Sequence, residues 1–501
     1  MSAISRDVVY WFGAAPTDDE RLEFQRRNLA IRTTAIEDAI DFNMAKAVVY
    51  CARLPYVSAA SARLNLFSCA LNHGLMVYLL AADDAIQAHL QQEVPDVARK
   101  EYLARLVRSR TGIVPSYECA ENIARHNAGR HANVTLQIYT PPGLHLKPEQ
   151  EFFLRRAFSD CTVLTLEPLS GGLSATTFSA QATLIASEAG PRPLPFFVKL
   201  DEAHKILTES NNYVNYATHH IPWYLRPNLD RSRCLYGVDL GILVGSFVVQ
   251  SESLWEAVLS GKGPRYIHAL FEDTLMGWRS QAYSCQPATG RLANSLHDVF
   301  KWDKVLDKIV CRAEQHGAVR SPKDLWEQLI NLPEQKWREA PMHGDMHAEN
   351  VRVRNNDAII IDLANARIGP LCADVASLEV WLAFQVPGSI KQIPHRSVWT
   401  QVVKHLFSPA EVTRSPTLAN TDVGLDWLRA CVRQTRMIAG VICECDSEYA
   451  TAVALHLLRR AQYLDGANEE DEYRRSYAYF LGSQLVEWLA MKPFPSAHAT
   501  I

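Results

Sequence analysis

The sequence predicts an α/β domain at the amino terminus, followed by a two-lobed α+β domain whose second lobe is helical. Three observations support this architecture: alternating strand and helix patterns before residue 105, a loop and hairpin motif over residues 343–362, and amphipathic helices toward the carboxyl end. A chain of 501 residues is also longer than one hydrophobic core normally serves, so more than one domain is expected.

The composition excludes several classes of protein. With 48% hydrophobic and 21% charged residues, the chain is not mainly disordered. Its net charge is −4 and it contains no long basic tract, so no nucleic-acid partner is expected. The longest uncharged stretch, residues 64–82, is interrupted at Asn72-His73-Gly74, and the first residues contain no apolar signal, so neither a membrane span nor secretion is expected.

Eleven cysteines are scattered along the chain, which suggests reduced thiols and a cytoplasmic location. Cys443 and Cys445 form the only close pair. One intervening residue and the lack of a second pair do not favour zinc, so buried packing is the expected role of these cysteines.

Residues 1–105 alternate between strand and helix. An apolar run at residues 8–13 ends in glycine, the capping box at residues 17–20 opens a helix, and further apolar runs occupy residues 45–51 and 74–80. This order resembles the receiver domain of response regulators. The strand ends Gly13-Ala14-Ala15 and Cys51-Ala52-Arg53 lack the acidic residues of a phosphoacceptor site, so an interaction or sensory role is expected. Residues 106–159 are interpreted as a connector.

The strongest motif begins with His343-Gly344-Asp345 and continues to Asn350, a strand, a turn and a second apolar strand that ends at Asp362. A hairpin brings its two ends together, so Asn350 and Asp362 can reach one metal ion. Amide and carboxylate oxygens suit Mg²⁺ on nucleotide phosphates, and Asp345 can orient a phosphate acceptor. The alternative is that His343 and Asp345 only cap a turn.

These residues resemble the aminoglycoside phosphotransferase and choline kinase branch of the protein-kinase-like superfamily. Gly369-Pro370 and Asp374 continue the same motif. The resemblance implies that Asp345 is catalytic, that Asn350 and Asp362 bind the metal, and that His343 and Asp374 support the catalytic loop. Gly344 replaces the arginine of conventional protein kinases, which disfavours that class.

Residues 160–250 are expected to form the nucleotide-binding lobe, with a flexible Gly171-Gly172 turn between two strands. Lys199 lies in an apolar strand, where an ammonium group that contacts phosphates and pairs with a helix carboxylate is expected. Glu209 is the preferred partner and Glu202 the second choice. The alternative for Lys199 is an edge-strand lysine that faces water.

Residues 251–501 complete the helical lobe of the kinase-like fold. The sequence therefore predicts an ATP- and Mg²⁺-dependent phosphotransferase for a small hydroxyl- or amine-bearing molecule, in a bacterial signalling context. The alternative is a nucleotide-sensing regulatory module without turnover, because similar domains, including those of the ternary-complex-associated type, are fused to signalling modules. The N-terminal domain is a possible binding site for a protein partner.

Overall fold

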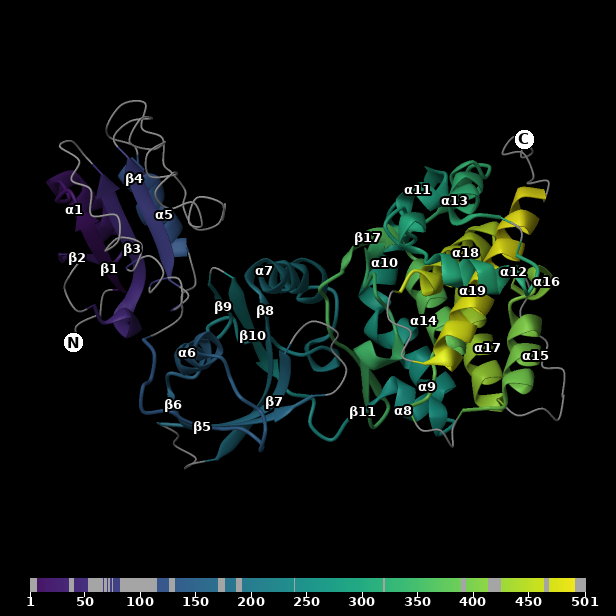
Figure 1. The fold of residues 1–501 in the computed structure, drawn as a ribbon, viewed down its shortest axis with the longest axis horizontal. Helices are drawn as coiled ribbons and strands as arrows, with labels where there is room; N and C mark the ends of the chain where they lie inside the picture. The colour runs from purple at the N-terminus through teal and green to yellow at the C-terminus, as the bar shows by residue number, and fades with distance from the viewer. Residues whose placement is uncertain are drawn as a thin grey trace. The chain divides into compact units, whose positions relative to one another are not determined.

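The computed structural model describes residues 7–35, 40–52, 66, 70, 73, 75–81, 115–125, 131–169, 176–185, 192–237, 239–318, 320–388, 393–412, 425–463 and 468–491. The chain forms two compact units. Unit 1 comprises residues 1–210 and 228–249, and unit 2 comprises residues 211–227 and 250–501. Figure 1 labels their helices and strands.

Unit 1 begins with a parallel sheet of four strands in the order β2-β1-β3-β4. The strands are β1 (Asp7–Gly13), β2 (Leu29–Thr33), β3 (Ala45–Ala52) and β4 (Met76–Ala81). Helix α1 (Asp18–Arg26) begins at the predicted capping box, in which the Thr17 hydroxyl accepts from the Glu20 amide. The short strand β2 was not predicted, because its exposed Arg32 and Thr33 at the sheet edge conceal the apolar pattern.

The carboxyl ends of β1 and β3 are joined by backbone contacts. The Ala14 amide donates to the Cys51 carbonyl at 2.8 Å, and Gly13 has a φ of +80°. A Cβ atom at Gly13 would lie 2.2 Å from the Cys51 carbonyl oxygen, so only glycine fits this approach. Among the described residues that end these two strands, 13–15 and 51–52, none carries a carboxylate.

A second sheet in unit 1 has the order β5-β6-β7-β8-β10-β9 and is antiparallel except for the β5–β6 pair. Its strands are β5 (Gln137–Tyr139), β6 (Cys161–Pro168), β7 (Thr176–Leu184), β8 (Pro193–Glu202), β9 (Leu235–Tyr236) and β10 (Leu240–Ser246). Helix α6 (Pro148–Ala157) places Phe153 and Leu154 in the same buried cluster as Leu164 and Val198. Helices α5 (Pro115–Arg125) and α6 and strand β5 all lie in the segment interpreted as a connector.

Unit 2 is mainly helical (Figure 1). Its α-helices are α8 (Leu254–Leu259), α9 (Gly263–His268), α10 (Met276–Ser284), α11 (Leu292–Ser295), α12 (Asp307–Glu314), α13 (Pro322–Ile330), α14 (Ala373–Phe384), α15 (Arg396–Leu406), α16 (Pro409–Val412), α17 (Asp426–Ile442), α18 (Asp446–Ala461) and α19 (Glu469–Met491). Helix α18 is buried along almost its whole length and packs against α14 and α19. It forms the centre of the helical core.

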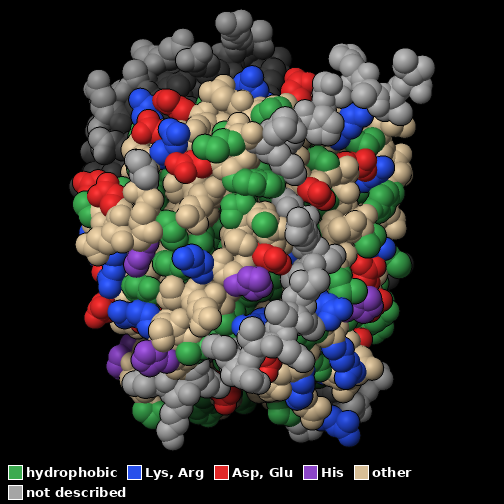
Figure 2. Space-filling view, turned by 90° about the vertical axis from the view of Figure 1, so that its right-hand side faces the viewer, with side chains coloured by type: hydrophobic (Ala, Val, Ile, Leu, Met, Phe, Trp, Pro, Cys, Tyr) green, Lys and Arg blue, Asp and Glu red, His purple; other side chains and the backbone are tan. Residues whose placement is uncertain are grey.

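Short strands in unit 2 carry the loop motif: β14 (Glu339–Met342), β15 (Val351–Arg354), β16 (Asp357–Ile360) and β17 (Arg367–Pro370). Strand β14 pairs with β17, and β15 forms a hairpin with β16. On the face shown in Figure 2, hydrophobic, acidic and basic side chains are interspersed, in keeping with a net charge near zero. None of the described helices has the length and apolar character needed to cross a bilayer.

Candidate active site

The loop that contains the histidine–glycine–aspartate triplet is fixed by Asp374, in the first turn of α14. The buried Asp374 carboxylate accepts the His343 amide at 2.6 Å and the Gly344 amide at 3.1 Å. Burial raises the pKa of Asp374, while these two amides and His343 oppose that rise. One carboxylate therefore satisfies two consecutive amides of the loop.

His343 and Gly344 are both confined by their surroundings. The fully buried His343 ring accepts from the Asp345 amide at Nδ1 (3.3 Å), which leaves Nε2 to donate to the Ile361 carbonyl at 2.9 Å. Gly344 has a φ of +77°, and a Cβ atom there would lie 2.4 Å from the Asn365 carbonyl oxygen. No larger residue fits at this position, and an arginine would require a different loop.

The predicted hairpin brings Asn350 and Asp362 to the same end. Val351 pairs with Ile360, and the Ile361 amide donates to the Asn350 carbonyl at 2.9 Å. The Asn350 side-chain nitrogen donates to the Asp345 carbonyl at 3.0 Å, so its amide oxygen is the atom suited to a metal. The exposed Asp362 has a φ of 58°. This backbone conformation costs a residue other than glycine about 1–3 kcal/mol, and such strained residues cluster at functional sites.

The carboxylate of Asp345 is paired with Arg459 on α18. The Arg459 Nη2 atom donates to Asp345 Oδ1 at 2.8 Å, and its Nη1 atom reaches the Gly344 carbonyl at 3.4 Å. The side chains of Arg459 and Asp345 are 17% and 31% exposed, so the pair is only partly screened by water. Sequence reasoning missed Arg459, because an arginine on an amphipathic helix is usually a surface residue.

His347 lies on the other side of Asp345, with its Nε2 atom 3.9 Å from Asp345 Oδ2. Its ring stacks on Trp381 at a centroid distance of 5.4 Å. Burial lowers the pKa of His347 to about 4, against the opposing effect of Asp345. The ring is therefore neutral at physiological pH, and Arg459 is the cation that faces the Asp345 carboxylate.

Unit 1 contains the predicted lysine pair. Lys199 Nζ donates to Glu209 Oε2 at 2.8 Å, and both residues are buried. Because β8 is bonded to β7 and β10 on its two sides, Lys199 is not on an edge strand, and that alternative is wrong. Glu202, the second choice of partner, instead pairs with Lys205. Gly171 and Gly172 lie outside the described residues, so the structure says nothing of the predicted phosphate-binding turn.

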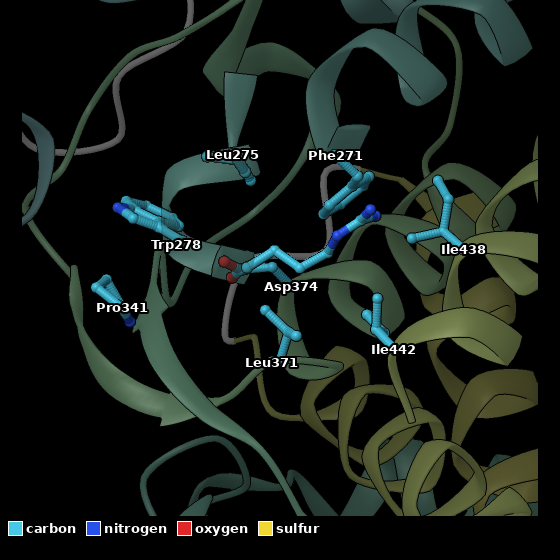
Figure 3. A pocket seen from close by; sticks show the side chains of 9 residues that line it. Phe271, Leu275, Trp278, Pro341, Leu371, Asp374, Ile438 and Ile442 are labelled. Carbon is cyan, nitrogen blue, oxygen red and sulfur yellow. The ribbon is translucent and has the colours of Figure 1, made fainter. Parts of the chain in front are cut away.

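A small cavity of about 20 Å³ lies beside Asp374, and Figure 3 shows this residue among the mostly apolar walls. Its walls include Phe271, Leu275, Trp278 and Ile438. This volume holds about one water molecule. The cavity is thus too small to receive a nucleotide or an acceptor substrate.

Residues 282–394 match the sequence model of a family described as the phosphotransferase enzyme family. This segment includes the histidine–glycine–aspartate loop, the hairpin and Asp374. Over this segment the match confirms the resemblance predicted from the motif, and it supports a phosphotransferase enzyme. A comparison with curated proteins finds no match for the chain.

Several solved structures are similar to the chain at low identity. One is the amicoumacin kinase hAmiN in complex with AMP-PNP, Ca²⁺ and Ami, with 11% identity, coverage of 63% of this chain and 87% of that one, and a TM-score of 0.35. A choline/ethanolamine kinase family protein from Mesorhizobium loti has 14% identity, coverage of 65% and 92%, and a TM-score of 0.29. An aminoglycoside-3'-phosphotransferase of type VIII has 16% identity, coverage of 59% and 92%, and a TM-score of 0.29.

Proposed function

We propose that this protein is an ATP- and Mg²⁺-dependent phosphotransferase that acts on a small hydroxyl- or amine-bearing molecule. The observation that carries the proposal is the arrangement of Asp345, Asn350 and Asp362 around one braced loop and hairpin. The Asn350 side chain is bonded to the Asp345 backbone, and the Asn350 carbonyl is bonded to the strand that leads into Asp362. A carboxylate for the acceptor and two oxygen ligands for a metal thus come from one rigid segment.

The proposed roles follow from the chemistry of each group. Asn350 and Asp362 offer hard oxygen ligands, which fit Mg²⁺, and the bound ion would neutralise charge on the nucleotide phosphates. The Asp345 carboxylate would accept a hydrogen bond from the acceptor hydroxyl or amine and orient it for attack. In unit 1, Lys199 would donate to the phosphates while Glu209 holds its ammonium group in place.

A titration with and without magnesium tests the metal assignment. We expect ATP to bind the wild-type chain more tightly with Mg²⁺, and Asp362→Asn to remove that gain, because a neutral amide replaces one charged ligand. Asp357→Asn is the matched control, since Asp357 lies on the same hairpin at the turn. Unchanged magnesium dependence in Asp362→Asn would show that the metal is held elsewhere.

A second candidate function is a nucleotide-sensing module without turnover, and the Asp345–Arg459 ion pair is the observation that favours it. An arginine on the catalytic carboxylate competes with an acceptor for the same oxygen. We rank the nucleotide-sensing function second, because Arg459 can also hold Asp345 in position for an acceptor that binds the Oδ2 atom of Asp345. In an active enzyme, Arg459→Ala should lower turnover, by up to about a hundred-fold if Asp345 shifts by 1 Å, with ATP affinity unchanged.

The N-terminal parallel sheet is proposed to be a receiver-like domain that does not accept phosphate. Its support is the order of β1, α1 and β3 together with the carboxylate-free strand ends at Gly13 and Cys51. Such a domain would serve as an interaction module, through which a signalling partner could influence the phosphotransferase. Incubation with a small-molecule phosphodonor tests this part, and we expect no phosphorylation of residues 7–52.

A further inference from the structure

Two cysteines and a glutamate that are far apart in the sequence converge in the core of unit 2. Cys372 precedes α14, Cys443 follows α17, and Glu448 lies in the first turn of α18. One ligand atom from each residue, two thiol sulfurs and a carboxylate oxygen, lies within 4.8 Å of the other two. Cys372 and Glu448 are fully buried and Cys443 is partly buried.

The Glu448 carboxylate is the unusual member of this cluster. Its Oε2 atom accepts the Glu444 amide at 2.7 Å, as a carboxylate near a helix start often does. Its Oε1 atom is buried, and the Cys372 thiol is the side chain that interacts with this carboxylate. A buried carboxylate beside two thiols is costly to keep charged, and a bound cation is one way to stabilise it.

From this geometry we propose that Cys372, Cys443 and Glu448 bind a zinc ion that is separate from the magnesium of the active site. Thiolate sulfur selects zinc over magnesium and calcium, which prefer oxygen alone. Around a tetrahedral zinc ion, with bonds of about 2.0–2.3 Å, neighbouring ligand atoms lie roughly 3.3–3.8 Å apart. The observed spacing reaches this range through side-chain movements of roughly 1 Å.

Cys445 is close to the cluster in the sequence but is not one of the three residues whose ligand atoms converge. Cys445 lies two residues after Cys443 at the start of α18, and its exposed thiol is 3.2 Å from the Ser447 hydroxyl. Zinc sites with three protein ligands complete their coordination with water, and those with four are closed. The Cys443–Cys445 spacing alone did not favour zinc, because Cys372 and Glu448, the other two ligands of the proposed site, lie elsewhere in the sequence.

The position of the site indicates a structural role. Cys372 lies two residues before Asp374, which binds the amides of the catalytic loop, and Glu448 lies on the helix that carries Arg459. A zinc ion would tie the start of α14 to the start of α18. It would thereby hold the two helices that position the loop and the carboxylate of Asp345.

Titration of the full chain with Co²⁺ and Zn²⁺ tests the proposal. The protein is purified under reducing conditions, stripped with a chelator, and titrated with Co²⁺, whose absorption reports tetrahedral geometry and thiolate ligation. We expect one equivalent to produce thiolate charge-transfer bands that Zn²⁺ abolishes, and Zn²⁺ to raise the Tm. A site made only of oxygen ligands, such as that of Asn350 and Asp362, gives no such bands, so the result does not depend on the proposed function.

Variants assign the ligands. Cys372→Ser and Cys443→Ser should lose the bands, and Glu448→Gln should weaken Co²⁺ binding at least tenfold. Cys431→Ser, which changes another buried cysteine of unit 2, should retain them. The proposal is overturned if the wild-type chain shows no charge-transfer bands, if the bands survive Cys372→Ser, or if mass spectrometry finds a Cys372–Cys443 disulfide in the reduced preparation. Where the serine variants do not fold, the wild-type spectrum and Glu448→Gln decide.

Discussion

Replacing Asp374 by alanine should destabilise unit 2 and release the catalytic loop. The buried carboxylate accepts two backbone amides, those of His343 and Gly344. Each amide left without a partner costs about 1–3 kcal/mol, so the loss is about 2–6 kcal/mol. For a domain of this size, 1 kcal/mol lowers the Tm by about 2–4 °C, which gives a fall on the order of 10 °C.

Calorimetry of the full chain measures this fall, and hydrogen exchange of peptides over residues 340–350 measures the release of the loop. Asp345→Asn is the matched control, because the Asp345 carboxylate is partly exposed and, among the described residues, accepts no backbone amide and forms its ion pair with the Arg459 side chain, so a smaller fall in Tm is expected. The decrease in Tm for Asp374→Asn should lie between those of Asp374→Ala and Asp345→Asn, since the asparagine side chain retains one acceptor oxygen. If Asp345→Asn were the more destabilising change, the structural and catalytic roles of the two aspartates would have been exchanged.

Two further predictions concern the core of unit 2. Arg436→Met should lower the free energy of unfolding in urea by about 3–5 kcal/mol, because Glu379, which is 0% exposed and bonded to Arg436 at 2.9 Å, would remain as an uncompensated charge. The double variant Glu379→Leu/Arg436→Met should recover most of the lost stability. Failure to recover it would refute the reasoning. Burial, together with the charge of Arg459, holds the pKa of His456 well below its usual range. The unfolded chain therefore takes up a proton that the native unit does not, so stability should fall as the pH drops below about 6.5. His456→Gln should reduce that fall, to which His347 also contributes, while His297→Gln, at an exposed position, serves as the control.

The parts of the site that sequence could predict are those formed by neighbouring elements. Asn350 and Asp362 belong to one hairpin, and its turn and apolar strands come from one continuous stretch of the sequence. Lys199 and Glu209 belong to a strand and the helix that follows it, and Glu209 lies on the helix face that also buries Ile206. In both cases local periodicity is enough to show which side chains point the same way.

The parts that sequence could not predict depend on packing between distant helices. Arg459 meets Asp345, and Cys372 meets Cys443 and Glu448, only because α18 packs against α14. No local pattern reports which helices of a bundle are neighbours, so each of these residues resembles an ordinary core or surface residue. For the same reason, the sequence around Cys443 and Cys445 gave no indication that Cys372 lies beside Cys443.

Phosphoryl transfer by the wild-type chain and its Asp345→Asn variant tests the central claim most directly. The assay follows ADP formation with Mg²⁺ and ATP across a panel of small acceptors that carry hydroxyl or amine groups. We predict that at least one acceptor stimulates ADP formation by the wild-type chain, and that Asp345→Asn abolishes this stimulation while ATP affinity stays within a few-fold. An Asp345→Asn protein that transfers phosphate as well as the wild type would contradict the account.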